Sequence, residues 1–150
     1  MGFRRKGREY ALQILFQIDV SGHSIEDIFP FFWKDKNDLQ DVRDFTERIV
    51  HGVREDLQQI DNIIAANAEH WRLNRMAIVD RNILRMAIYE FLFELQTPLI
   101  VIIDEAIEVA KKFGSEESGS FVNGILDAVK KKIENGIIAS KRTPVDSRQE

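Results

Sequence analysis

The sequence predicts an all-α protein of about seven helices. Three observations favour this class: apolar residues recur at helical spacings in successive segments, short polar connectors separate these segments, and no stretch alternates convincingly as a strand would. A chain of 150 residues is long enough to bury its own core. We therefore expect one helical domain over residues 1–138, followed by a disordered polar tail over residues 139–150.

The first predicted helix, residues 2–19, has two dissimilar halves. Its apolar stripe, which requires a protein core, comprises Ala11, Ile14, Leu15 and Ile18. Its front end carries a group of cations that we call the basic head: Arg4, Arg5, Lys6 and Arg8. The basic head lies at the positive end of the helix macrodipole, where carboxylates are favoured. A helix that departs from its own charge preference suggests a polyanionic ligand.

Two further helical segments follow. Ser24 is the expected N-terminal cap of a short helix whose regularity Pro30 limits. From residue 39 to residue 64 the apolar spacing is helical again. We expect Gly52, together with residues 55–56, to bend or break this segment into two helices.

The middle of the chain predicts the centre of the molecule. Residues 70–75 have no clean period and are expected to form a packed connector with Trp71 as its aromatic anchor. The next helix, residues 79–95, is apolar on more than half of its circumference. A helix of this kind is buried by neighbours on most sides.

Two more helices complete the prediction. Thr97 and Pro98 are expected to start one of them, with the threonine side chain as the cap. The β-branched run 99–103 could form a strand, but the helical spacing that continues beyond it favours a helix that ends at Gly114. The last helix begins near Ser118 and is expected to end at residues 135–136.

Composition bounds the class of function. The chain carries 21 Lys and Arg against 25 Asp and Glu, a net charge of −4, so the basic head is a local feature on an acidic body. The absence of cysteine excludes disulfide and thiolate sites and is compatible with a reducing cytoplasm. No apolar run reaches the roughly 18 residues of a membrane span. We expect a soluble, cytoplasmic protein.

The sequence contains no pattern typical of a catalytic or metal site. The three histidines are scattered, and no glycine-rich loop is suited to phosphates. The acidic residues Asp104, Glu105 and Glu108 are interpreted as complements to the dipole at a helix start. We therefore expect no enzymatic activity, no metal and no cofactor.

Several interpretations remain open from the residues alone. The basic head is compatible with a solvated terminus, a membrane-surface helix or a nucleic-acid contact. Phe16 and Phe121 lie at the edges of their apolar stripes. Each is therefore either an exposed contact residue or part of the rim of the core.

Three blocks of sequence resemble the signature of the NusB family of transcription antitermination factors. They are residues 4–13 (RRKGREYALQ), 80–90 (DRNILRMAIYE) and, together, 104–114 and 121–127 (DEAIEVAKKFG and FVNGILD). The resemblance implies two small helical sub-bundles packed together. It also implies an RNA-binding adaptor that binds single-stranded boxA RNA of ribosomal RNA leader transcripts with the ribosomal protein NusE, in the RNA polymerase antitermination complex.

The resemblance also assigns residues. It implies RNA contacts at the basic head and before the FVNG motif, namely at Arg4, Arg5, Lys6, Arg8, Ser118, Gly119, Ser120 and Phe121. It implies NusE contacts at Phe16 and Asp80, although Phe16 stands where a tyrosine is expected. Glu117 is expected to limit RNA affinity by charge repulsion. Cations can neutralise phosphates, and an edge aromatic can stack on an unpaired base.

Two other functions compete with this interpretation. One is a stand-alone NusB-like targeting module for RNA modification, since such domains also occur fused to RNA methyltransferases. The other is a purely structural helical interaction protein. The free protein is either a monomer or a homodimer, and the sequence does not distinguish the two states.

Overall fold

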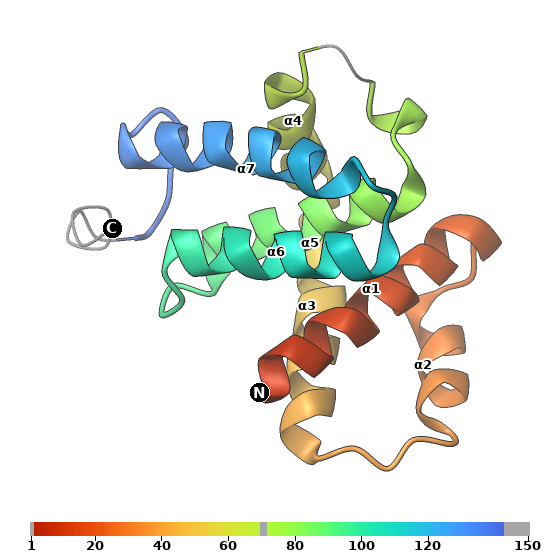
Figure 1. Ribbon diagram of the computed structural model, residues 1–150. Helices are drawn as coiled ribbons and strands as arrows, with labels where there is room; N and C mark the ends of the chain where they lie inside the picture. The colour runs from red at the N-terminus through yellow and green to blue at the C-terminus, as the bar shows by residue number, and fades with distance from the viewer. Residues whose placement is uncertain (1, 70–71, 143–150) are drawn as a thin grey trace.

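The computed structural model describes residues 2–69 and 72–142. Within these ranges all the regular secondary structure is helical (Figure 1). The predicted all-α class is confirmed. The elements are α1 (Phe3–Ser21), α2 (Ile25–Trp33), α3 (Gln40–Glu55), α4 (Leu57–Asn67), the 3₁₀ turn η1 (Leu73–Arg75), α5 (Ile78–Phe93), α6 (Leu99–Phe113) and α7 (Ser118–Glu134).

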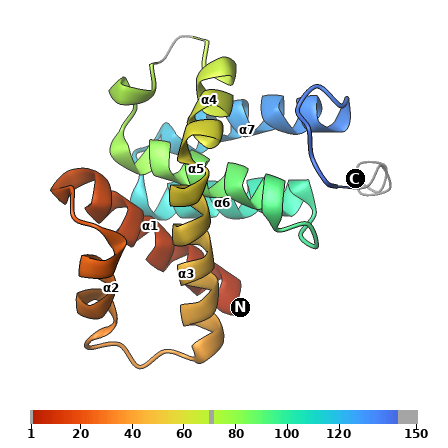
Figure 2. The same cartoon turned by 180° about the vertical axis from the view of Figure 1, so that it is seen from behind.

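The helices form two sub-bundles that share α5. In Figures 1 and 2, α1, α2 and α3 occupy the lower half of the molecule, and α4, α6 and α7 surround α5 in the upper half. Helix α5 packs against members of both groups, α1 and α3 on one side and α4, α6 and α7 on the other. Every residue from 82 to 92 is buried, which confirms the predicted central position of this helix.

The predicted start of α2 is confirmed, whereas the predicted role of Gly52 in the break after α3 is wrong. Ser24 caps α2 as expected, because its hydroxyl oxygen accepts a hydrogen bond from the Asp27 amide at 3.3 Å. The break between α3 and α4 lies at Asp56, whereas Gly52 lies inside α3. A Cβ atom at Gly52 would collide with the Tyr89 ring, so this glycine permits close packing of α3 on α5 and does not bend the helix.

The predicted capping role of Thr97 is wrong. The N-cap position of α6 is Pro98, whose carbonyl oxygen accepts from the amides of Val101 and Ile102, and no side chain caps this end. The helix therefore begins at Leu99, one residue later than it would if Thr97 were the N-cap. Run 99–103 is helical as predicted, and α6 ends at Gly114.

The C-terminal residues that the structure describes lie against the domain. Arg142 donates hydrogen bonds to the carbonyl oxygens of Phe91 at 2.8 Å and Glu94 at 3.0 Å, at the end of α5. Residues 139–142 of the predicted tail are among the described residues, and the predicted boundary at residue 138 stays a prediction. Residues 143–150 of the predicted tail, like His70 and Trp71 of the predicted connector, lie outside the described residues.

Among the described helices, none is both long enough and apolar enough to cross a lipid bilayer.

Candidate nucleic-acid interface

The basic head divides into buried and exposed cations. Arg8 is 4% exposed and faces Glu90 on α5, which is 2% exposed. The guanidinium donates two hydrogen bonds of 2.8 Å to the two carboxylate oxygens. Burial raises the pKa of Glu90, and the hydrogen bonds from Arg8 offset part of that shift. Arg8 therefore belongs to a buried ion pair and does not present its charge to a ligand, in contrast to its expected RNA contact.

Arg5 is also paired, at the surface between α1 and α6. It donates two hydrogen bonds to Glu105, at 3.1 and 2.8 Å. The hydrogen bonds from Arg5 lower the pKa of Glu105. The dipole interpretation of Glu105 is therefore wrong: α6 begins at Leu99, its first turn holds no acid, and Glu105 lies beyond that turn.

Arg4 and Lys6 supply the exposed charge of the basic head. The Arg4 guanidinium lies 4.8 Å from the centre of the Phe3 ring, and the Lys6 ammonium lies 4.9 Å from the centre of the Tyr10 ring. Both side chains are solvent-exposed. A cation above an aromatic ring keeps its outer face open to a phosphate.

The turn between α6 and α7 holds the second group of predicted RNA contacts. Ser118 is buried, and its hydroxyl oxygen accepts from the Ser115 amide at 2.9 Å, so its side chain closes the turn. Gly119 is half-buried and Ser120 is exposed. Phe121 is half-buried and packs against the core, which places it at the rim of the core.

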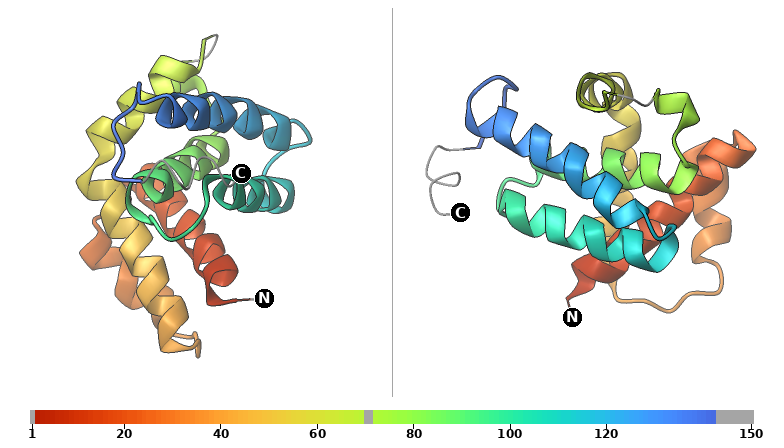
Figure 3. Two further views of the ribbon diagram at one scale, coloured as in Figure 1. Left: turned by 90° about the vertical axis from the view of Figure 1, so that its left-hand side faces the viewer. Right: turned by 45° about the horizontal axis from the view of Figure 1, so that its top comes forward.

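Phe121 and Glu117 line the same hollow as Asp80. This hollow has a volume of about 210 Å³ and lies between the start of α5 and the turn that precedes α7. Figures 1 and 3 show that turn beside α1 and the start of α5. Asp80 is 9% exposed, and its Oδ1 atom accepts no hydrogen bond from the described residues. A buried carboxylate oxygen without a donor is costly unless a ligand supplies one.

Phe16 lies on the second half of α1, the helix that packs against α5. Its side chain is 38% exposed. One turn further along, Asp19 accepts hydrogen bonds from Asn82 at 2.9 Å and from Arg81 and Arg85 at 3.0 Å, which fix α1 to the start of α5. These donors outweigh burial and lower the pKa of Asp19, although burial alone would raise it. Phe16 is thus an exposed apolar side chain on a rigid support.

Four separate hollows between the basic head and Phe121 share lining residues, each with the next. The first hollow, beside Arg4 and Gln96, shares Arg5 and Glu105 with the second. The second shares Lys111 with a third along the α6–α7 turn, and the third shares Ser115 with the hollow that contains Asp80. We call this row the α6 track. It brings together residues that are more than one hundred positions apart in the chain, which their order in the sequence did not reveal.

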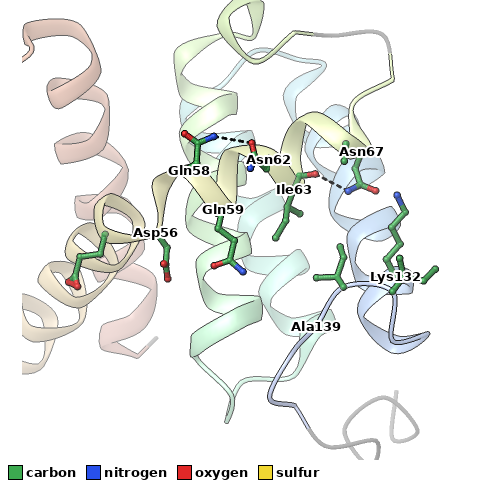
Figure 4. A pocket seen from close by; sticks show the side chains of 12 residues that line it. Asp56, Gln58, Gln59, Asn62, Ile63, Asn67, Lys132 and Ala139 are labelled. Carbon is green, nitrogen blue, oxygen red and sulfur yellow. Dashed lines mark hydrogen bonds between the residues drawn. The ribbon is translucent and has the colours of Figure 1, made fainter.

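Another hollow lies away from the α6 track and contains none of the predicted site residues. It has a volume of about 690 Å³ and lies between α4 and residues 132–139 (Figure 4). Its lining is rich in amide and apolar side chains, and Lys132 is the cation among the described residues that face it. This surface is poorly suited to a polyanion.

The described residues hold no group of three or more His, Asp or Glu side chains arranged around a metal position. His51 packs edge-on against Phe29, with the ring centres 5.4 Å apart. His70 lies outside the described residues.

Comparison with known proteins agrees with the sequence blocks. A model of the NusB family matches residues 5–131. The transcription antitermination protein NusB of Sorangium cellulosum is 45% identical over 129 residues, which cover 86% of this chain and 92% of that protein. The structure of Thermotoga maritima NusB superposes with a TM-score of 0.80 at 38% identity and covers 98% of this chain and 97% of its own.

A complex structure is also similar. It contains the antitermination factors NusB and NusE with double-stranded RNA, and the matching chain has a TM-score of 0.78 at 26% identity. The match covers 87% of this chain and 98% of that chain.

Proposed function

This chain belongs to the NusB family of transcription antitermination factors, and we propose that it acts as a cytoplasmic, non-catalytic RNA-binding adaptor. In this proposal it binds single-stranded boxA RNA of ribosomal RNA leader transcripts together with NusE. The resulting complex joins the RNA polymerase antitermination assembly. A related chain lies in a complex of NusB and NusE with double-stranded RNA, which supports NusE and RNA as classes of partner.

The α6 track is the observation that carries the proposal. Each of its hollows shares a lining residue with the next, with the exposed cation Arg4 in the first hollow and the half-buried Phe121 in the last. Alternating phosphate contacts and base stacking on one groove are typical of single-strand recognition. The sequence prediction of RNA contacts at Arg4 and Phe121 remains part of this proposal.

Asp80 and Phe16 provide a surface for NusE at the end of the track. The Oδ1 atom of Asp80 has no donor among the described residues and lies in a hollow that also contains Glu117. Two carboxylates favour a cationic or N–H donating group of a protein over a phosphate. Glu117 is exposed, and its charge repels an RNA backbone that approaches the hollow. It thereby lowers RNA affinity in the absence of NusE.

The test measures binding of a boxA RNA by the whole protein, with and without NusE, across a series of salt concentrations. A scrambled RNA and a boxA duplex serve as controls. We expect selective binding of the single-stranded boxA RNA, tightened by NusE, with affinity that falls as salt rises. Equal and weak binding of all three RNAs that ignores NusE would contradict the proposal and favour a structural interaction protein.

A further inference from the structure

We infer that Lys111 and Lys112, at the end of α6, bind the phosphates of the RNA strand between the basic head and Phe121. This inference rests on the proposed function and extends it to residues outside the three expected contact groups. In each contact an ammonium group binds a backbone phosphate, so the strength of the contact does not depend on the base sequence of the RNA.

Most cations of the basic head are not available to a ligand on the α6 track. Arg8 is buried with Glu90, and Arg5 is held by both oxygens of Glu105. Lys6 lies over Tyr10, whose ring packs against Phe32 of α2. This places the Lys6 ammonium on the α2 side of α1, away from α6. Arg4, Arg5 and Arg8 all line the first hollow of the α6 track, but Arg5 and Arg8 are held by carboxylates. Arg4 is therefore the head cation with its charge available there, and one cation binds a polyanion weakly.

The two lysines lie along the α6 track. Lys111 and Lys112 both line the second hollow of the α6 track, and Lys111 also lines the third. Their side chains are 66% and 59% exposed. A strand that runs from Arg4 to Phe121 along these hollows must therefore pass both ammonium groups. The sequence shows them only as two lysines in a helical last turn, which the helix dipole alone explains.

Each of these lysines already forms an ion pair with a carboxylate of the same chain. The Lys111 ammonium lies 3.4 Å from Glu108, and the side chains of both partners are more than half exposed. The Lys112 ammonium lies 2.9 Å from Glu9 on α1. The Lys111–Glu108 pair is exposed on both sides and is worth at most about 1 kcal/mol, so a phosphate can replace Glu108. In the second pair Lys112 is 59% exposed and Glu9 15% exposed, so the ammonium keeps an open side for a phosphate while Glu9 holds the other. Glu9 thus competes with RNA for Lys112.

The chain offers a matched control for the experiment. Lys131 and Lys132 are also adjacent lysines in the last turn of a helix, α7. Lys131 is 68% exposed and pairs with Asp127 at 3.0 Å. Lys132 lines the large hollow beside α4, away from the α6 track. The variants Lys111→Gln/Lys112→Gln and Lys131→Gln/Lys132→Gln therefore remove equal charge from equivalent helix positions.

The measurement is the affinity of the whole protein for single-stranded boxA RNA in the presence of NusE, as a function of salt. For the 111/112 variant we expect RNA affinity to fall roughly tenfold at low salt, and the log–log salt slope to be smaller by about 0.7 for each phosphate that is no longer neutralised. The 131/132 variant should bind as the unaltered protein does. Glu9→Gln should tighten RNA binding a few-fold, because it releases Lys112.

Two outcomes would overturn the inference. One is an unchanged affinity and salt slope in the 111/112 variant while the unaltered protein binds boxA RNA selectively. The other is a weaker affinity of this variant for NusE with RNA binding intact, which would make the lysines a protein-binding surface. Failure of the unaltered protein to select boxA RNA is a separate result and contradicts the proposed function itself.

Discussion

Two regions of the molecule hold buried carboxylates and treat them in opposite ways. Where α5 packs against the first half of α1, Glu90 of α5 accepts two hydrogen bonds from Arg8 of α1. At the hollow between α5 and α7, the Oδ1 atom of Asp80 receives none from the described residues. Removing one partner of a saturated buried pair destabilises the fold, whereas a buried acceptor without a donor offers a place for a donor from another molecule. The density of charge in the sequence does not distinguish these two situations.

The largest effect is expected from breaking the saturated pair. Arg8→Met leaves the Glu90 carboxylate buried without its partner, which should lower the free energy of unfolding by about 3–5 kcal/mol. Urea denaturation followed by far-UV circular dichroism measures this change. The double variant Arg8→Met/Glu90→Leu should recover much of the loss, because no buried charge remains. A loss below about 1 kcal/mol in the single variant would place the pair among ordinary surface contacts.

The next effect concerns the contact of α1 with the start of α5. Asp19→Asn removes the charge that accepts from Arg81, Asn82 and Arg85, and should cost about 2 kcal/mol in unfolding experiments at neutral pH. An unchanged unfolding midpoint would show that this clamp is dispensable.

Acidification should weaken the same contacts. The folded structure lowers the pKa of Asp19 and of Glu105. A carboxyl whose pKa is depressed by folding contributes stability that is complete above its unfolded pKa, about 3.9 for Asp and 4.3 for Glu, and that is lost as the pH falls through the folded value. Stability should therefore decline below about pH 4.3. The variant Asp19→Asn/Glu105→Gln should show a shallower decline, and a slope identical to that of the unaltered protein would contradict the assignment.

A smaller effect on stability is expected at the unsaturated site. Asp80→Asn should change the free energy of unfolding by less than about 1 kcal/mol, since Asp80 contributes mainly through the dipole of α5. It should weaken NusE binding by about tenfold, because a charged acceptor is removed. Asp104→Asn, an exposed acid on α6, serves as the control in the same titration. Equal NusE affinity in both variants would remove Asp80 from the interface.

Most of the fold was predictable because each helix has its own apolar period and stop signals. The central position of α5 follows from an apolar surface that extends around the helix, and the end of α6 follows from Gly114. These are local properties, and local sequence reports them. The start of α6 was misplaced because both Thr97 and Pro98 are suited to a helix start, and only the backbone hydrogen bonds show which residue occupies the N-cap.

The site was less predictable because pairing between distant segments decides it. Arg8 and Glu90 are 82 positions apart, and Arg5 and Glu105 are 100 apart. No local pattern relates these residues, so all four head cations look equally available in the sequence. Lys111 and Lys112 show the opposite case: they look like dipole complements and lie on the track only because α6 packs along α1.

The most direct test of this account compares two arginines of the basic head. Arg4→Gln and Arg8→Gln remove the same side chain from positions four residues apart on one helix. Unfolding in urea and binding of boxA RNA with NusE are measured for both, the latter at a temperature where both variants remain folded. We expect Arg4→Gln to weaken RNA binding a few-fold without loss of stability, and Arg8→Gln to lower stability while the folded fraction binds RNA normally. The reverse pattern would contradict this expectation.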